Sequence, residues 1–200
     1  IPIHKYKKFI NIFKTKIIIK KKLTNEANKL KKKLFKKNKI MGLHVRGTIQ
    51  KIAASHMLPP QPKDLLEYSY KIFKKEKCNK LFLVTEDLNY LEIFKKFYKD
   101  KLIYLNSPRS KCNLFGDHNK HFIKYIRKNH RYKLGKEAIV DALLLSFCQI
   151  LIGLESNVRD SAIVLSKLKQ KNYDLITEKN SHNRFIARWK WHLKNLFPFF

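Results

Sequence analysis

The sequence is poor in the residues that mark fibrous, low-complexity and disulfide-rich proteins. It has 5 Gly and 6 Pro among 200 residues, which excludes collagen-like and low-complexity classes. Its 3 Cys, at positions 78, 112 and 148, are too few and too scattered for a disulfide framework or a zinc site. We therefore expect a reducing compartment. Hydrophobic residues make up 44% of the chain, which is enough for a core and argues against wholesale disorder.

Long hydrophobic runs are also lacking. The longest, residues 139–154, is interrupted by polar residues and a glycine, so it cannot span a membrane. The run Ile17–Ile19 is too short for a signal peptide, and no cleavage site of small residues follows it. We expect a cytoplasmic protein. Because the first residue is Ile rather than Met, we also expect a processed chain or a fragment.

Acidic residues are scarce, since 15 Asp and Glu oppose 45 Lys and Arg and give a formal net charge of +30. Such a balance points to a polyanionic partner, either nucleic acid or an anionic membrane surface. Only 7 of the cations are Arg, and the aromatic residues recur at buried periodicities, which disfavours nucleic acid. A second interpretation stays open, in which the Lys residues form an ordinary solvated surface.

Short apolar runs alternate with amphipathic segments along the chain. The alternation predicts an α/β fold, a Rossmann-like parallel sheet with helices on both faces. A basic N-terminal segment (1–38) precedes the predicted domain (39–178), and a basic aromatic tail (179–200) follows it. We predict strands at 39–46, 81–85, 102–105 and 150–154, and helices at 24–37, 63–77, 88–98, 135–148 and 156–169.

The tail combines Trp189, Trp191 and the run Phe197–Phe200 with basic residues. Aromatic residues among cations are typical of segments that anchor proteins at anionic membrane surfaces. The alternative is a C-terminal helix that packs back on the domain through its apolar side. The sequence leaves both interpretations open.

Polar clusters close three of the four predicted strands. His44 and Arg46 end the first strand on one side of it, residues 85–87 end the second, and residues 155–157 end the fourth and open a helix. Ligands of open parallel sheets bind beyond the carboxyl ends of the strands. A guanidinium matches phosphate oxygens, and a helix N-terminus offers them free N–H groups. Together the clusters predict a phosphate-bearing ligand.

Each of these residues also has a structural interpretation. Glu86 with Asp87, and Ser156 with Asn157, can simply cap helices. Asp141 lies at the rim of the inward face of its predicted helix, without an ion-pair partner at helical spacing, and is either a solvated residue or a ligand contact. Dinucleotide-binding, P-loop, HExxH, Gly-x-Ser-x-Gly and DxD motifs are absent from the sequence, and we expect no metal.

In their order and spacing, the clusters resemble the donor-binding half of the alpha-1,6-fucosyltransferase/NodZ-like family, which is related to protein O-fucosyltransferases. That family carries a pattern close to H-V-R-R-T-D, then a Thr-Asp-Asp strand end, then a helix with an Asp, then S-S-Q-V. The resemblance covers about residues 39–168. This chain has HVRGTI at 44–49, TED at 85–87, KEAIVDALLLSFCQILIG at 136–153 and ESNV at 155–158.

The resemblance implies a glycosyltransferase of the GT-B fold with GDP-fucose, or a related GDP-sugar, in the Rossmann-like domain. It implies metal-independent inverting transfer to a glycan acceptor, with no cofactor besides the donor substrate. Arg46 would grip the β-phosphate of the donor and assist the departure of GDP, a catalytic role that a positioned guanidinium can fill. The other implied substrate-binding residues are His44 and Asp141 at the guanine, Ser156 and Asn157 at the pyrophosphate, together with Thr85 and Asp87.

Three departures of the chain from the family pattern stand out. Gly47 stands where the family has its second Arg, Ile49 replaces an Asp, and Glu155 replaces a Ser. Only 38 residues precede the first predicted strand, so residues 1–38 are interpreted as a remnant of the acceptor domain or a linker. The alternative function is a basic nucleic-acid-binding or membrane-surface protein, peripheral at the membrane, that is a degraded transferase fragment without activity.

Overall fold

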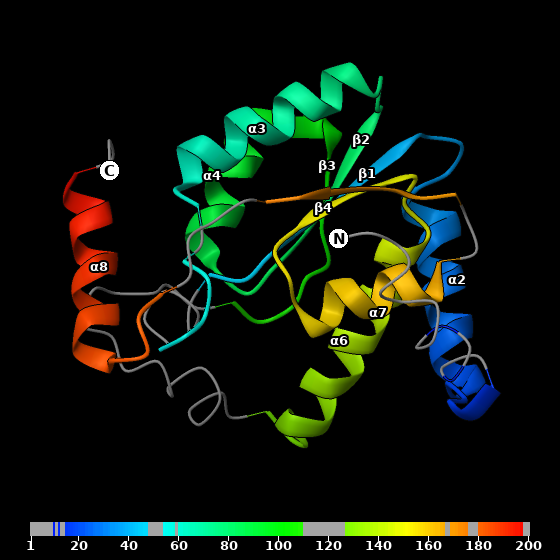
Figure 1. The fold of residues 1–200 in the computed structure, drawn as a ribbon. Helices are drawn as coiled ribbons and strands as arrows, with labels where there is room; N and C mark the ends of the chain where they lie inside the picture. The colour runs from blue at the N-terminus through cyan, green and yellow to red at the C-terminus, as the bar shows by residue number, and fades with distance from the viewer. Residues whose placement is uncertain are drawn as a thin grey trace.

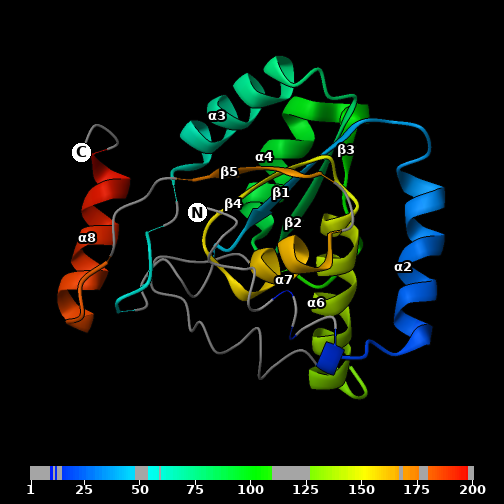
Figure 2. The same ribbon diagram turned by 45° about the vertical axis from the view of Figure 1, so that its right-hand side comes forward.

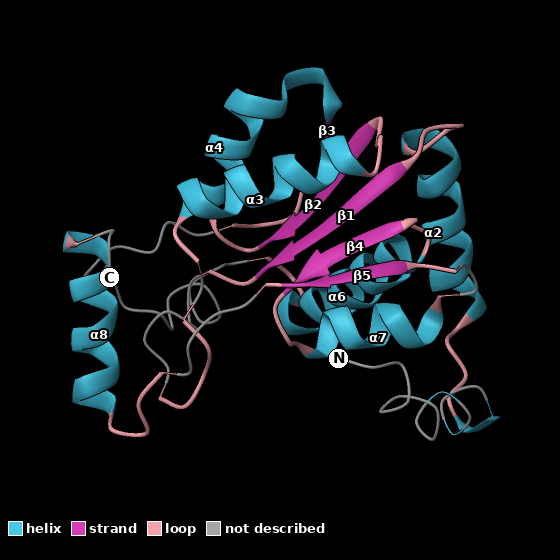
Figure 3. Ribbon diagram, turned by 45° about the horizontal axis from the view of Figure 1, so that its top comes forward, coloured by secondary structure: helices cyan, strands magenta, loops and turns pink. Residues whose placement is uncertain are grey.

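The computed structural model describes residues 10, 12, 15–47, 54–58, 60–109, 127–166, 169–175 and 180–197. They form a five-stranded sheet in the order β3-β2-β1-β4-β5, in which every neighbouring pair is parallel (Figure 3). This confirms the predicted Rossmann-like α/β fold. The strands are β1 (Ile40–Val45), β2 (Lys80–Thr85), β3 (Leu102–Ile103), β4 (Ile150–Gly153) and β5 (Lys171–Asp174).

Helices cover both faces of the sheet, as Figures 1 and 2 show from two directions. On one face lie α3 (Pro62–Lys75) and α4 (Leu88–Tyr98), and a short 3-10 helix (Lys99–Lys101) follows α4. The other face carries α2 (Lys21–Leu34), α6 (His130–Ser146) and α7 (Asn157–Leu165). The last described helix is α8 (Arg184–Leu196).

Side chains along the central strands point alternately to the two faces, so a core forms on each side of the sheet. In β1, Met41, Leu43 and Val45 join the core beneath α3 and α4, whereas Ile40 joins the core beneath α2, α6 and α7. All six residues of β1 are buried. A strand covered on both faces is mostly apolar, which is why the central strands were predictable as nearly continuous apolar runs.

Several element boundaries differ from the predictions. β5 was not predicted, because its residues KNYD are polar and it lies at the sheet edge. The strand predicted at 102–105 is shorter, and α6 starts at His130 instead of residue 135. Thr24 does not start α2, because that helix begins at Lys21, and the Thr24 hydroxyl donates to the Lys21 carbonyl at 2.9 Å.

The basic segment before β1 is partly integrated into the fold. Helix α2 packs in the same layer as α6, with Ala27 fully buried and an ion pair of 2.8 Å between Glu26 and Lys136. Hydrophobic contact, rather than charge, holds this Lys-rich helix in place, since Leu23, Leu30 and Leu34 pack against the core. Across the described part of the chain, no helix has the length and apolar character needed to cross a bilayer.

Candidate functional site

A pocket of about 410 Å³ opens at the carboxyl ends of β1 and β2. Its walls come from these strand ends, the segment after β3, helix α6 and the first turn of α7. Parallel strands end at the same edge, so polar residues far apart in the sequence meet there. Five of the seven residues singled out from the sequence line this pocket, namely His44, Arg46, Thr85, Asp141 and Asn157.

His44 is held rigidly at the end of β1. Its side chain is buried, and a hydrogen bond of 3.0 Å joins its Nδ1 to the Ser156 hydroxyl. Burial, together with the charges of Arg46 and Arg159, lowers the pKa of His44 to about 3. The imidazole is therefore neutral at physiological pH, and such a ring has one nitrogen that donates and one that accepts.

Ser156 stands behind His44 rather than in the pocket wall. As the N-cap of α7, its hydroxyl accepts from the Arg159 backbone N–H at 3.2 Å, which confirms the predicted cap. Asn157 opens the helix and lines the pocket. Glu155, the departure from the family pattern, is exposed and lies outside the pocket lining. The first turn of α7 therefore faces the pocket without that carboxylate in the wall.

Arg46 places a guanidinium at the pocket wall. Its Nε lies 3.7 Å from a carboxylate oxygen of Glu86, and about a third of its side chain is exposed (34%). Ion pairs of this length and exposure contribute little to stability, so they restrain the guanidinium weakly. A ligand anion can therefore compete for Arg46 at small cost.

Asp87 has a structural place instead of a pocket position. It is fully buried, caps α4 by accepting from the Asn89 backbone N–H at 2.8 Å, and donates its own N–H to the Thr85 hydroxyl at 3.2 Å. A Cβ at Gly47 would lie 2.5 Å from the Asp87 carboxylate. The side chain of Asp87 thus occupies the space that a larger residue 47 would need.

Asp141 projects from α6 into the pocket wall and is partly exposed. It makes no hydrogen bond to any residue that the structure describes. The pKa of Asp141 is raised to about 7, because burial and, to a smaller extent, the nearby Glu137 outweigh the charge of Arg109, which lowers it. Any ligand that brings N–H donors would stabilise the ionised form of a carboxylate in this position.

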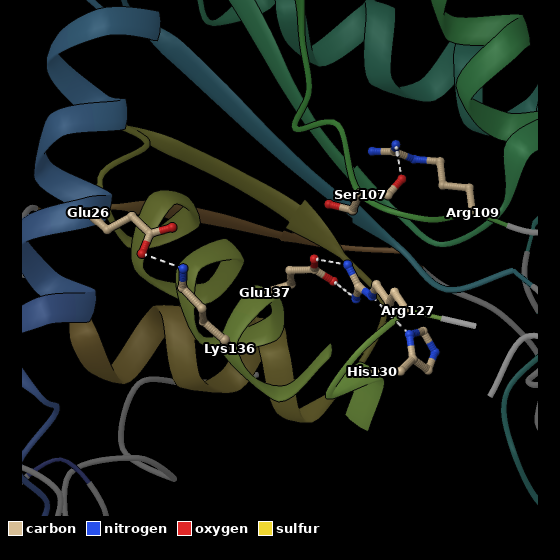
Figure 4. A network of polar contacts seen from close by, with 7 residues as sticks. All are labelled: Glu26, Ser107, Arg109, Arg127, His130, Lys136 and Glu137. Carbon is tan, nitrogen blue, oxygen red and sulfur yellow. Dashed lines mark hydrogen bonds and ion pairs between the residues drawn. The ribbon is translucent and has the colours of Figure 1, made fainter. Parts of the chain in front are cut away.

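Arg109, which was not predicted as a site residue, also lines the pocket. Its guanidinium donates to three carbonyl oxygens, those of Leu105 (2.7 Å), Ser107 (2.9 Å) and Thr85 (3.0 Å). Figure 4 shows the bond to Ser107. Burial lowers the pKa of Arg109, and Asp141 and Tyr104 offset part of this. Arg109 thereby ties the end of β2 to the segment after β3.

Two further ion pairs fix the surroundings. Arg127 donates to both carboxylate oxygens of Glu137 at 2.7 and 2.8 Å and to His130 Nδ1 at 2.9 Å (Figure 4). Arg159 is buried under α7 and pairs with Asp174 of β5. The lack of a side chain at Gly153 leaves room for it, since a Cβ there would lie 3.1 Å from the Arg159 stem. The sequence feature that could have indicated this pair is an Arg in the first turn of a helix, where acidic residues are usual.

No family model and no curated protein matches this sequence. Among solved structures, the chain resembles the apo form of POFUT1 with a TM-score of 0.51 and 7% identity, over 78% of this chain and 46% of that chain. It also matches NodZ alpha-1,6-fucosyltransferase soaked with GDP-fucose (TM-score 0.47, 16% identity, 74% and 43% covered). Fucosyltransferase NodZ from Bradyrhizobium gives a TM-score of 0.49 with 14% identity, over 82% and 48%. The chain spans less than half the length of these proteins, and it has a fucosyltransferase-like fold.

Proposed function

We propose that this chain is the donor-binding part of a fucosyltransferase-like glycosyltransferase, and that its pocket holds the GDP portion of a GDP-sugar such as GDP-fucose. The observation that carries the proposal is the pocket at the carboxyl ends of β1 and β2. It brings the guanidinium of Arg46, the first turn of α7 and the carboxyl of Asp141, which has no hydrogen-bond partner among the described residues, around one space of about 410 Å³. The motif resemblance at 44–49, 85–87 and 155–158 supports GDP as the ligand.

The pyrophosphate has two complementary groups in the pocket lining. The N-terminus of α7, which starts at Asn157, presents free backbone N–H groups and the positive end of the helix dipole. Arg46 supplies a planar fork that matches phosphate oxygens. Because departure of GDP builds negative charge on the β-phosphate, Arg46 would stabilise the transition state of an inverting transfer without a metal ion.

The guanine has a carboxylate acceptor. Its N1–H and exocyclic amine are neighbouring donors, and Asp141 has no competing donor among the described residues. Neutral His44 lines the same pocket without adding a charge that would repel these donors. Arg109 keeps Asp141 in a positive field, which favours the ionised carboxylate that guanine requires. An adenine presents no such pair of donors, so the pocket favours guanine.

Thermal unfolding with and without nucleotide tests donor binding. GDP is expected to raise the melting temperature in proportion to RT ln(1 + [GDP]/Kd), GMP to raise it less, and ADP to have little effect. Arg46→Ala should abolish the GDP shift, while Arg184→Ala, which removes an exposed Arg on α8, should keep it. An unmoved melting temperature in millimolar GDP, or an equal shift in Arg46→Ala, would overturn the proposal.

Transfer of the sugar to a glycan acceptor is the second part of the proposal. We expect this chain to hydrolyse GDP-fucose, with water accepting the fucosyl group as GDP leaves, in the presence of a chelator and faster than Arg46→Ala does. An acceptor glycan added to the complete protein should accelerate that release and accept the sugar with inverted anomeric configuration, as read by nuclear magnetic resonance. GDP binding without any Arg46-dependent release would leave the chain a binding module and refute its role in transfer.

A further inference from the structure

Helix α8 stands at one side of the molecule, apart from the helices that cover the sheet, in all three ribbon views (Figures 1, 2 and 3). The segment before it is tied to the body by two backbone hydrogen bonds of 2.8 Å, from Ser55 to Ser181 and from Asn180 to His56. Asn183 caps the helix by accepting from the Phe185 N–H at 2.9 Å. The helix is thus anchored at its start.

The helix has two apolar faces that point in opposite directions. Ala187 and Trp191, one turn apart, are buried at 0% and 9% exposure. At about 100° per residue, Phe185, Trp189, Leu193 and Leu196 fall on the far side, within an arc of about 80°. They are exposed at 79%, 66%, 46% and 71% respectively. Packing on the protein therefore uses the narrow face and leaves the wide face, with Ile186 at its edge, in solvent.

Cations border the wide apolar face. Arg184, Arg188 and Lys190 are exposed, and the sequence from 180 to 200 contains no acidic residue. An apolar stripe bordered by cations and bearing a Trp matches the boundary between lipid headgroups and acyl chains. Protein interfaces are depleted of Lys, and binding of nucleic acid would leave Leu193, Leu196 and Ile186 in water.

We propose that α8 binds the surface of a membrane containing anionic lipids. The wide face, formed by Phe185, Trp189, Leu193 and Leu196, enters the interface, and the bordering cations remain among the headgroups. Ala187 and Trp191, on the buried narrow face, keep α8 packed on the rest of the protein, which stays on the aqueous side. This inference does not depend on GDP binding, because α8 contributes no residue to the donor pocket.

Vesicle co-sedimentation tests the apolar face. The intact chain is mixed with vesicles of phosphatidylcholine alone, or of phosphatidylcholine with phosphatidylserine. We expect binding to the anionic vesicles and a loss of at least about tenfold in Trp189→Ser/Leu193→Ser. Tyr132→Ser, which removes an aromatic residue of 71% exposure from α6, should bind like the parent. Equal binding by the double variant, or equal loss in Tyr132→Ser, would overturn the proposal.

A second pair of variants separates α8 from the net charge of +30. Arg188→Glu/Lys190→Glu and Lys71→Glu/Lys75→Glu change the net charge equally, but the latter pair is exposed on α3. Only the α8 pair should weaken binding by more than about tenfold, because each cation at an anionic surface raises the affinity for the vesicle by roughly tenfold or less. An equal loss in both variants would mean general attraction and refute the proposal.

Tryptophan fluorescence gives a readout that needs no loss of binding. Trp191→Phe leaves Trp189 as the single tryptophan, and Trp189→Phe leaves Trp191. We expect anionic vesicles to shift the emission of Trp189 to the blue and brominated lipid to quench it, while Trp191 changes little. The reverse pattern, or a shift of Trp189 caused by concentration-dependent self-association in the absence of lipid, would show a different occupant of this face.

Discussion

Two carboxylates at opposite ends of the same parallel sheet have opposite surroundings. Glu76, at the C-terminal end of α3, accepts from Lys171 Nζ at 3.0 and 3.2 Å and from the Tyr173 hydroxyl at 2.6 Å. These hydrogen bonds, Tyr173 first, lower the pKa of Glu76. Asp141, at the carboxyl ends of the strands, has no such donor among the described residues, and burial raises its pKa to about 7.

The difference separates a structural end of the sheet from a binding end. The cluster around Glu76 joins α3 to β5 and satisfies its own charge, so a ligand has nothing to add there. Asp141 has no hydrogen-bond donor among the described residues, so its ionised form destabilises the fold until a ligand supplies donors. Changes at the two carboxylates should therefore move stability in opposite directions, and only the end with Asp141 should respond to GDP.

The largest expected effect is the loss of Glu76. Glu76→Ala leaves Lys171 and Tyr173 without their acceptor and should lower the free energy of unfolding by about 3 kcal/mol, measured by urea denaturation. The GDP-induced shift in melting temperature should not change. Glu67→Ala, at an exposed position of the same helix, serves as the control and should cost less than about 0.5 kcal/mol. A loss of GDP binding in Glu76→Ala would remove the distinction between the two ends.

Asp141→Asn should act in the opposite direction. Because the folded-state pKa of Asp141 lies above its unfolded value, ionisation destabilises the fold progressively as the pH rises from about 4 to about 7. The variant should therefore match the parent at pH 4. At pH 8 it should be more stable by about 2 kcal/mol, within the ceiling of ~4 kcal/mol set by the full pKa difference. Thermal unfolding at several pH values measures this, and destabilisation at pH 8 would contradict it.

GDP affinity should follow the same titration. Guanine needs the ionised carboxylate, whose fraction rises about tenfold between pH 6 and pH 8 for a pKa near 7. Isothermal titration calorimetry should show a dissociation constant that falls by about this factor over the range. The phosphates of GDP titrate as well, so Asp141→Asn provides the baseline. The same pH dependence in that variant would assign the effect to the nucleotide.

The sequence predicted the ends of the sheet better than its edges. β1, β2 and β4 were found because they are buried on both faces, and the meeting of His44, Thr85 and Asn157 in one pocket followed from the parallel topology. β5 was missed because its edge position allows polar residues, and with it the pair of Asp174 and Arg159 was missed. Arg109 was missed because its three acceptors are carbonyl oxygens placed by tertiary folding, for which no residue pattern exists.

The smallest expected effect is that of losing a helix cap, and two variants allow it to be compared between α7 and α8. Ser156→Ala and Asn183→Ala each remove a side-chain acceptor at a helix N-terminus, of α7 and α8 respectively, and each should cost about 1 kcal/mol. Ser156 also holds His44 at 3.0 Å, so its loss frees an imidazole in the pocket wall. We expect a weakening of GDP binding by about threefold, roughly one modest hydrogen bond, in Ser156→Ala alone. Equal GDP affinity in the two variants would reduce Ser156 to a cap and leave His44 positioned by packing.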